Sequence, residues 1–236
     1  MGHIAWVVGK SGSGKSTSVM PLKYKDLDII GLDPETTILL NGDGDPLPNP
    51  NFKDKYIEGE NLYNNVKLSK LLGLGALVEK KKEEGKEVKA IVVDTWTRIC
   101  TNTVDSPQFS GQSGYDKWKT FAVDNVQIFT IIKELLPEDC IVYMLAHPET
   151  ATDENGRPSM KVATEGNLLD KRGGVESFSN IVVFTQKVQV PGQSDQYSFR
   201  VNNYATTKTP IGMFEEENIP NDLGLLDRAI RAHYQI

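Results

Sequence analysis

One stretch near the start of the chain constrains the fold more than any other. Residues 9–16, GKSGSGKS, match the pattern G-x-x-x-x-G-K-[ST]. The apolar run before it, residues 4–8 (IAWVV), is typical of a short buried strand, and residues 16–20 (STSVM) can begin a helix. A strand, a glycine-rich turn and a helix start, in that order, are the setting in which this pattern forms a phosphate-binding loop.

The chemistry of the loop follows from its residue types. Glycines adopt positive φ and let main-chain N–H groups approach a polyphosphate closely. Lys15 is expected to reach the β- and γ-phosphates, and the Ser16 hydroxyl to ligate Mg²⁺. The positive end of the following helix would add to this attraction, although Pro21 predicts that this helix is brief or kinked. The expected phosphate contacts are Gly9, Ser11, Gly12, Ser13, Gly14, Lys15, Ser16 and Thr17. An ordinary Gly/Ser turn with a solvated lysine is the alternative.

Bulk composition limits the class of protein. The chain has 236 residues, of which 39% are hydrophobic and 25% charged, as expected for one globular α/β domain over residues 1–236. A net charge of -6 argues against non-specific coating of nucleic acid but permits a local basic groove. Cys100 and Cys140 show no metal spacing and favour a reducing compartment. With no signal peptide and no membrane-spanning run, the sequence predicts a cytoplasmic protein.

An aspartate follows the next buried strand. Residues 88–93 form an apolar run that ends at Asp94. After a phosphate-binding loop, an aspartate at a strand end is the residue that holds Mg²⁺, directly or through water. Ser16 and Asp94 are therefore the predicted metal ligands. Thr95 could assist them or simply cap a helix.

Two further strand ends carry candidate catalytic groups. Residues 36–40 form a strand that ends in a polar turn with Asp43 and Asp45, either of which could orient an attacking water. Both could instead be ordinary turn formers. Residues 140–146 form a third buried strand, and His147 after it could contact the γ-phosphate or the water, or merely end the strand.

The remaining pattern predicts the other elements. In the first half of the chain, turn and helix signals give a connector at 23–31, a surface loop at 46–52, a helix at 61–84 and a polar loop at 101–114. A helix follows with apolar positions from 118 to 136 and a capping pair Ser113/Asp116. The rest is a long polar loop at 148–167, hairpin strands at 180–186 and 196–204, and a helix at 223–234 capped by Asn221.

These features together resemble a known family. The loop at 9–16, the strand at 90–94, the strand ending in His147 and the terminal hairpin are similar to those of phage-encoded, single-domain ATPases with a RecA-like core, a group that includes phage single-strand-annealing recombination proteins. Softer similarities lie at 36–48, 146–149, 167–171, 208–210 and 219–223. The resemblance implies an α/β P-loop NTPase fold: a mostly parallel central sheet flanked by helices, with an antiparallel edge hairpin and no separate helical lid.

The resemblance also implies ligands and partners. ATP and Mg²⁺ would bind at Lys15, Ser16 and Asp94. The loops after Asp94 and His147 would face single-stranded DNA. The phosphate contacts of the DNA would then be Arg157, Lys161 and Arg172. Lys208 resembles the basic residue that such proteins lend to a neighbour's γ-phosphate, which implies a homo-oligomer, either a ring or a filament.

Three functions are compatible with these expectations. The leading one is an ATPase of a bacterial host's cytoplasm that binds single-stranded DNA and supports annealing or recombination. The alternative is an ATP-dependent switch or regulator that acts on a protein partner without nucleic acid. A small-molecule kinase is less favoured, because the chain shows no compact lid with clustered arginines.

Overall fold

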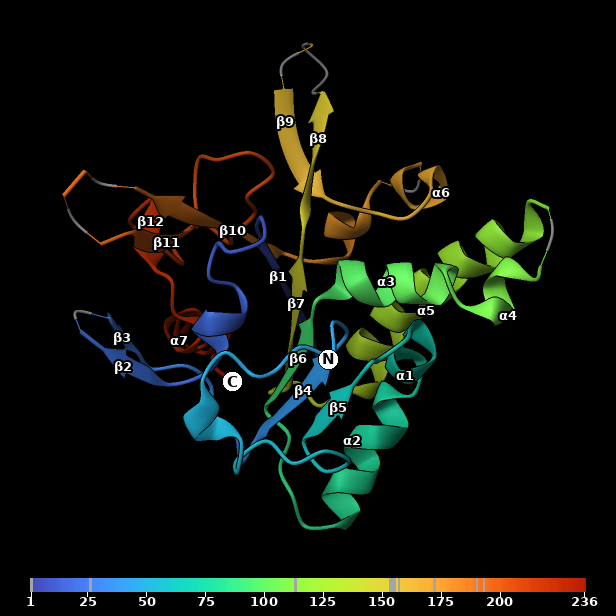
Figure 1. Cartoon of the computed structure of the whole chain (residues 1–236), viewed down its shortest axis with the longest axis horizontal. Coiled ribbons are helices and arrows are strands. Elements are labelled where there is room, and N and C mark those ends of the chain that lie inside the picture. Colours follow the sequence, from blue (N-terminus) through green and yellow to red (C-terminus); the bar gives the residue numbers. More distant parts are fainter. Residues whose placement is uncertain are drawn as a thin grey trace.

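A central sheet organises the structure, a computed structural model that describes residues 2–25, 27–112, 114–152, 156, 158–171, 173–189, 191–192 and 194–236, without the side chains of 158 and 167. Among these residues, eight strands pair in the order β12-β11-β10-β1-β7-β6-β4-β5 (Figure 1). The strands are β1 (His3–Val8), β4 (Thr37–Asn41), β5 (Leu62–Asn64), β6 (Ala90–Asp94), β7 (Ile141–Ala146), β10 (Ile181–Val188), β11 (Gln196–Arg200) and β12 (Asn218–Pro220).

Most of the sheet is parallel. The strands from β10 across to β5 run parallel to their neighbours, whereas β11 and β12 are antiparallel. The prediction of a mostly parallel sheet with an antiparallel hairpin near one edge is confirmed. Because parallel strands all end at the same edge, the segments that follow β1, β4, β6 and β7 gather there.

Helices cover both faces of the sheet, because successive strand residues point to opposite sides. Trp6 and Val8 of β1 pack with helices α1 (Leu68–Leu72), α2 (Leu74–Glu83), α3 (Trp96–Val104) and α5 (Asp116–Leu135). Ala5 and Val7 face the other side, which α7 (Leu223–Tyr234) and the 3₁₀ turn η1 (Ser16–Val19) cover. The chain is thus a mixed α/β fold with its sheet between two apolar layers.

Several predicted elements differ from the structure. The connector at 23–31 contains the hairpin β2 (Leu22–Tyr24) and β3 (Leu27–Ile29). The single helix at 61–84 is strand β5 followed by α1 and α2, because residues 62–64 pair with β4 at the sheet edge and Gly73 separates the helices. The surface loop at 46–52 ends in the 3₁₀ turn η2 (Pro50–Phe52).

Two predicted loops also carry regular structure. The stretch 101–114 holds the end of α3 and the short helix α4 (Pro107–Ser110), which the Ser106 side chain caps. The stretch 148–167 forms the hairpin β8 (Pro148–Thr152) and β9 (Pro158–Val162), then begins α6 (Asn167–Asp170) and precedes the 3₁₀ turn η3 (Val175–Phe178). Polar side chains on a two-stranded hairpin lack the apolar alternation that identifies strands.

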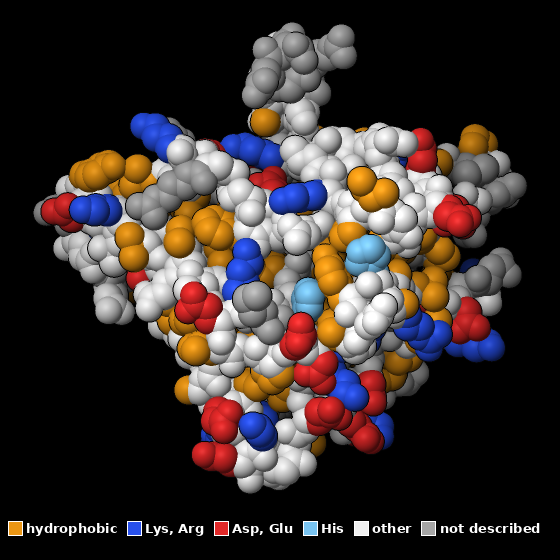
Figure 2. Space-filling model, turned by 180° about the vertical axis from the view of Figure 1, so that it is seen from behind, with side chains coloured by type: hydrophobic (Ala, Val, Ile, Leu, Met, Phe, Trp, Pro, Cys, Tyr) orange, Lys and Arg blue, Asp and Glu red, His pale blue; other side chains and the backbone are white. Residues whose placement is uncertain are grey.

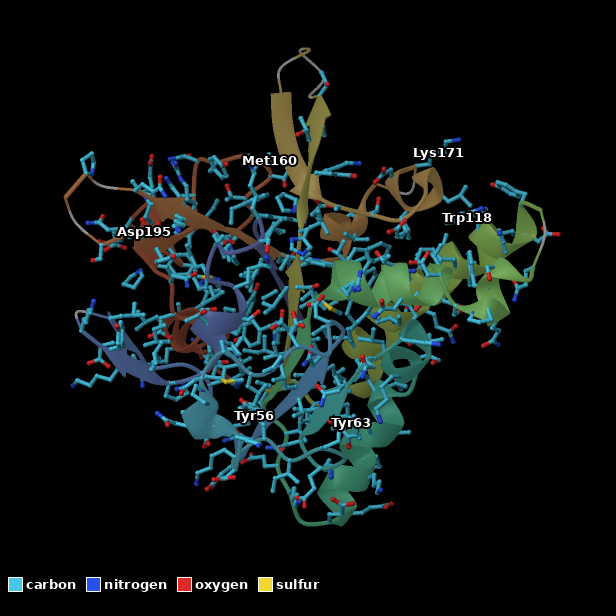
Figure 3. All side chains as sticks on the ribbon, viewed as in Figure 1. Tyr56, Tyr63, Trp118, Met160, Lys171 and Asp195 are labelled. Carbon is cyan, nitrogen blue, oxygen red and sulfur yellow. The ribbon has the colours of Figure 1, made fainter. Side chains whose placement is uncertain are left out.

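The β8–β9 hairpin projects from the body of the molecule (Figure 1). Its root is fixed, since the Ala163 N–H donates to the His147 carbonyl at 2.8 Å. Met160 lies midway along the hairpin (Figure 3), and its carbonyl accepts the Thr206 hydroxyl at 3.1 Å. The hairpin follows β7 directly, since only His147 lies between β7 and β8.

The described helices have a further property in common. None of them is both long enough and apolar enough to span a lipid bilayer.

Candidate functional site

The loop after β1 has a conformation that glycines permit. Gly12 and Gly14 have φ of +72° and +92°, in the left-handed region. At Gly9 the restriction is steric, because an added Cβ would lie 1.7 Å from Oγ1 of Thr185. The Gly9 N–H donates to the Ala146 carbonyl at 2.9 Å, which joins the loop to the end of β7. The glycines at these positions are thus required by the observed backbone.

The loop presents a group of open hydrogen-bond donors. Within the described part of the chain, no partner is found for the main-chain N–H groups of Gly12, Gly14, Lys15 and Ser16. Successive N–H groups of this kind form a concave site for an anion. The helix expected after the loop is only the one-turn η1, which ends before Pro21, so the brief form is confirmed. Its dipole is correspondingly small, and the N–H groups and Lys15 supply most of the positive potential.

Lys15 folds over the loop from which it originates. Its residue is only 6% exposed, and Nζ donates to the carbonyls of Gly9 at 2.6 Å and Lys10 at 3.1 Å. Burial lowers the pKa of Lys15, whereas the carboxylates of Asp94 and Asp43 raise it. The lysine therefore has only neutral carbonyls as direct partners, with two negative charges nearby.

Asp94 ends β6 and faces the loop. Burial raises its pKa to about 6, contact with the Ser16 hydroxyl lowers it, and repulsion from Asp43 raises it further. Its Oδ1 is buried, with no hydrogen-bond partner among the described residues. A buried carboxylate oxygen without a partner is costly, so this atom is a natural ligand for a cation.

One cavity brings several predicted residues together. It has a volume of about 200 Å³ and lies between the loop and the ends of β4 and β6. Its lining consists of Ser16, Val19, Met20, Leu39, Asn41, Asp43, Asp45, Pro46, Leu47, Pro48 and Asp94. The two predicted metal ligands and both candidate water-orienting aspartates therefore share one space.

The turn after β4 is held by a residue that the sequence did not single out. Asn41 donates through Nδ2 to the Asp45 carbonyl at 2.9 Å and accepts the Gly44 N–H through Oδ1 at 3.0 Å. The Asp43 carboxylate accepts from the Thr95 hydroxyl at 3.3 Å and lies 3.9 Å from Nε of Arg98. The turn-forming and water-orienting roles are thus compatible in this segment, since the turn is fixed by Asn41 and not by the aspartate carboxylates.

His147 lies beside the loop, half-buried at the end of β7. Burial lowers its pKa, the charge of Lys15 lowers it further, and a hydrogen bond with the Gly9 backbone raises it. Its main-chain N–H donates to Oγ1 of Thr97 at 2.9 Å. The imidazole is consequently neutral at pH 7 and close to the loop lysine.

The remaining candidates lie away from this cavity. Lys208 is exposed, and its Nζ donates to the Ser179 carbonyl at 2.6 Å. Ser179 lies just before β10 and therefore at the opposite edge of the sheet from the loop. Nζ of Lys161 is 3.0 Å from a carboxylate oxygen of Glu149 and 2.8 Å from one of Asp170. Burial lowers the pKa of Lys161, but the two carboxylates raise it by more, so that its pKa lies above the ordinary value. Arg157, Arg172 and the capping residue Ser113 lie outside the described residues.

The predicted cap of the last helix is wrong by one residue. Asp222, not Asn221, caps α7 by accepting the Gly224 N–H at 2.8 Å. The same carboxylate accepts the N–H groups of Ile30 and Gly31. Asn221 instead donates through Nδ2 to the Gly14 carbonyl at 2.9 Å. An N-cap needs a free side-chain acceptor near the first turn, and Asp222 is the residue so placed.

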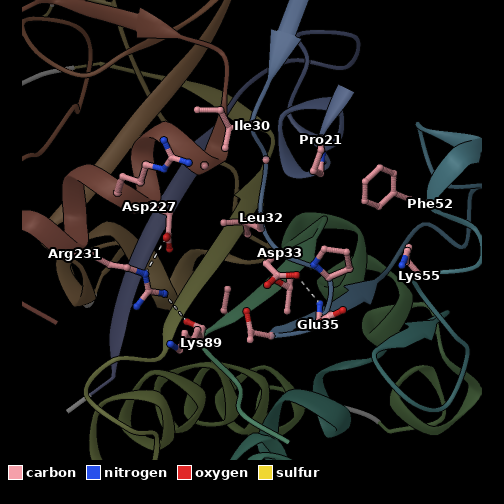
Figure 4. A pocket seen from close by; sticks show the side chains of 17 residues that line it. Pro21, Ile30, Leu32, Asp33, Glu35, Phe52, Lys55, Lys89, Asp227 and Arg231 are labelled. Atoms are coloured by element: carbon pink, nitrogen blue, oxygen red, sulfur yellow. Dashed lines mark hydrogen bonds and ion pairs between the residues drawn. The ribbon is translucent and has the colours of Figure 1, made fainter. Parts of the chain in front are cut away.

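A larger cavity lies elsewhere in the described part of the chain. It has a volume of about 600 Å³ and lies where β4 and β6 begin, at the edge of the sheet opposite the loop (Figure 4). On its wall Arg231 pairs with Asp227 at 2.8 Å and donates to the Lys89 carbonyl at 2.9 Å. Its lining mixes cations and anions and includes none of the predicted site residues. Ligands of parallel sheets bind at the carboxyl ends of the strands, so the smaller cavity is the better candidate.

The protein alone does not offer a complete metal site. The described residues contain no group of three or more His, Cys, Asp or Glu side chains placed to hold a metal ion. Ser16 and Asp94 supply hard oxygen donors, which suit Mg²⁺, an ion that usually takes its other ligands from phosphates and water. The residues present therefore fit a magnesium ion that arrives with a phosphate ligand.

Comparison of the sequence with protein-family models and with curated proteins finds no match. The assignment of a function therefore depends on the chemistry of the site.

Proposed function

We propose that this chain is a RecA-like P-loop ATPase that converts ATP and water to ADP and phosphate. One observation carries the proposal: Ser16 after β1 and Asp94 at the end of β6 line a single cavity, and the charge of Lys15 lies close enough to interact with the Asp94 carboxylate. The mostly parallel sheet with its antiparallel hairpin is the architecture that the family resemblance implies.

The loop would bind the triphosphate. Its open N–H groups donate to phosphate oxygens, and Lys15 exchanges the carbonyls of Gly9 and Lys10 for a charged partner. Ser16 and Asp94 would hold Mg²⁺, which neutralises charge on the phosphate oxygens when bound. This arrangement pairs the buried charges that the free protein leaves without direct partners.

The residues around the cavity would act on the attacking water. Asp43 or Asp45 orients it, and the neutral His147 imidazole offers a hydrogen bond to the γ-phosphate or to the water. Water orientation and transition-state hydrogen bonds are the main contributions that a protein makes to phosphoryl transfer.

We further propose that the protein binds single-stranded DNA as a homo-oligomer and supports annealing or recombination, in the cytoplasm of a bacterial host. The projecting β8–β9 hairpin is suited to contact a partner, and Lys208 is exposed and able to reach a neighbouring copy. Lys161 would have to exchange Glu149 and Asp170 for DNA phosphates. Cys100 and Cys140 are buried free thiols, as in a reducing compartment.

A protein-directed switch is the second candidate. It is favoured by the neutralised Lys161 and by the overall charge of -6. Figure 2 shows Lys and Arg scattered among Asp and Glu over the face it presents. A surface of this kind provides little attraction for a polyanion.

Measuring ATP turnover with and without single-stranded DNA, at a low and a high salt concentration, separates these functions. Strong stimulation that weakens with salt supports the DNA-dependent ATPase, because phosphate contacts release counterions. Turnover without DNA binding or stimulation supports the switch. Lys15→Ala should abolish nucleotide binding or turnover in either case. Wild-type protein that neither binds nor hydrolyses ATP would refute the proposal.

A further inference from the structure

A residue near the end of the chain reaches the phosphate loop. Nδ2 of Asn221 donates to the Gly14 carbonyl at 2.9 Å, across 207 positions of sequence. Asn221 is 5% exposed, and its Oδ1 is buried with no partner among the described residues. The amide orientation is fixed by chemistry, since only the nitrogen can donate to a carbonyl.

This contact sets the direction of a phosphate donor. In a planar trans peptide the C=O and the following N–H point in opposite directions. The Gly14 carbonyl accepts both the Asn221 amide and, at 3.0 Å, the main-chain N–H of Ser18. Holding the carbonyl on these two donors turns the Lys15 N–H to the other side of the loop. That N–H is among the open donors described above. Asn221 thus acts on the phosphate site through the Gly14–Lys15 peptide.

The close approach depends on glycine and on a rigid support. A Cβ at position 14 would lie 2.6 Å from Nδ2 of Asn221, so Gly14 makes room for the amide. On the other side, Asp222 fixes the segment through its bonds to the N–H groups of Ile30, Gly31 and Gly224. Asn221 is therefore held in place by the hydrogen bonds of its neighbour Asp222, none of which involves the loop.

We propose that Asn221 is a positioning residue that presets the phosphate loop for a polyphosphate, an inference that rests on the proposed nucleotide binding. It touches no reacting atom. Together with the Ser18 N–H, its amide holds the Gly14–Lys15 peptide in the orientation that binds phosphate oxygens, so that the loop need not rearrange on binding. Preorganisation of this kind raises affinity by removing an ordering cost.

The test compares two ligands and three variants by calorimetry: a Mg²⁺-bound ATP analogue that is not hydrolysed, and inorganic triphosphate, which has no base. Asn221→Ala should weaken both to the same extent, by about three- to tenfold, the value of one hydrogen bond. Asn221→Asp keeps the shape but replaces the donor with an anion, so the loss should be at least as large. It also carries the test if the alanine variant does not fold.

Asn125→Ala is the matched control. Asn125 is fully buried in α5, and its Nδ2 donates to the Phe121 carbonyl at 2.8 Å. Its removal should lower the melting temperature as Asn221→Ala does, yet leave both affinities unchanged. Equal binding by wild type and Asn221→Ala would overturn the inference. A loss for the ATP analogue but not for triphosphate would also overturn it, since Asn221 would then contact the base side. If wild type binds neither ligand, the proposed function fails instead.

Discussion

Replacing Asp94 by asparagine should stabilise the free protein at neutral pH. Asp94 is half-buried at the end of β6, and its Oδ1 is fully buried with no hydrogen-bond partner among the described residues. Burial is the main reason that its pKa rises to about 6. An asparagine side chain has nearly the same shape and no charge, so the Asp94→Asn variant does not bear the cost of a buried anion.

The magnitude follows from the pKa. The rise from the ordinary value of 3.8 to about 6 corresponds to about 3 kcal/mol at pH well above both values, at about 1.4 kcal/mol per pKa unit. The folded chain holds this proton more tightly than the unfolded chain, so Asp94 contributes a loss of stability as pH rises from about 4 to about 6. Of this loss, about 2 kcal/mol falls between about pH 4.5 and about pH 7.5.

Urea unfolding of wild type and Asp94→Asn at those two pH values measures the effect. The stability advantage of the variant should grow by about 2 kcal/mol from the lower to the higher pH. Asp105→Asn, at an exposed position at the end of α3, controls for the loss of one negative charge. If the difference in free energy of unfolding between Asp94→Asn and wild type is the same at both pH values, the pKa of Asp94 is not raised by burial and the reasoning is refuted. Mg²⁺-bound nucleotide should then stabilise wild type more than the variant, because only wild type offers the anionic ligand.

Two further substitutions test the proposed catalytic roles. His147→Ala should lower turnover about tenfold or more while ATP affinity changes little, because a hydrogen bond made chiefly in the transition state affects kcat. If the variant turns over ATP as fast as wild type, His147 has no part in the mechanism. Since its pKa lies below the ordinary value, turnover between about pH 7 and 8 should show no titration from this imidazole. Lys208→Ala should leave ATP binding intact and lower turnover only under conditions where the protein oligomerises, which single-turnover assays over a range of protein concentrations can detect; equal turnover throughout would exclude the cross-subunit role.

The elements that were predicted correctly are those with a strong local signal. Strands β6 and β7 are apolar runs buried on both sides, which is how parallel strands inside an α/β fold read. Helix α5 repeats apolar residues at helical spacing over 20 residues. In both cases the pattern within the segment is sufficient, because the burial it predicts does not depend on which neighbour provides it.

The elements that were missed take their structure from distant neighbours. Strand β5 has only three residues and is specified by pairing with β4, while the local sequence continues a helical pattern. The β8–β9 hairpin is polar and is supported by the His147 carbonyl at its root and by Thr206 at its middle. Tertiary pairing overrides local preference in both segments. The last residues of α3, 101–104, were predicted as loop, because the polar residues Thr101 and Thr103 interrupt the apolar pattern that includes Ile99 and Cys100.

The residues of the candidate site also fall into two groups, those that a motif indicates and those that only the structure shows. Lys15, Ser16 and Asp94 were predicted because the chemistry requires those residue types at strand ends. Asn41, Arg98, Thr185 and Asn221 were not, although each contacts a predicted residue or its segment. Their side chains have no motif spacing, because Asn41 and Asn221 bind main-chain groups, Arg98 lies near the Asp43 carboxylate and Thr185 limits the space at Gly9.

The conformation of the glycine-rich loop therefore depends on the end of the chain. Gly9 fits only because it meets Thr185 of β10 without a side chain, and Gly14 fits against Asn221 after β12. Without β10 to β12 in the sheet, the Gly14 carbonyl would keep the Ser18 N–H but lose the Asn221 amide. The loop would then be freer to sample the other conformations that glycine allows. The motif thus supplies the N–H donors, whereas residues of the completed sheet fix their orientation. A polyphosphate should therefore bind and stabilise only the folded chain, in which β10 to β12 are paired with the N-terminal strands.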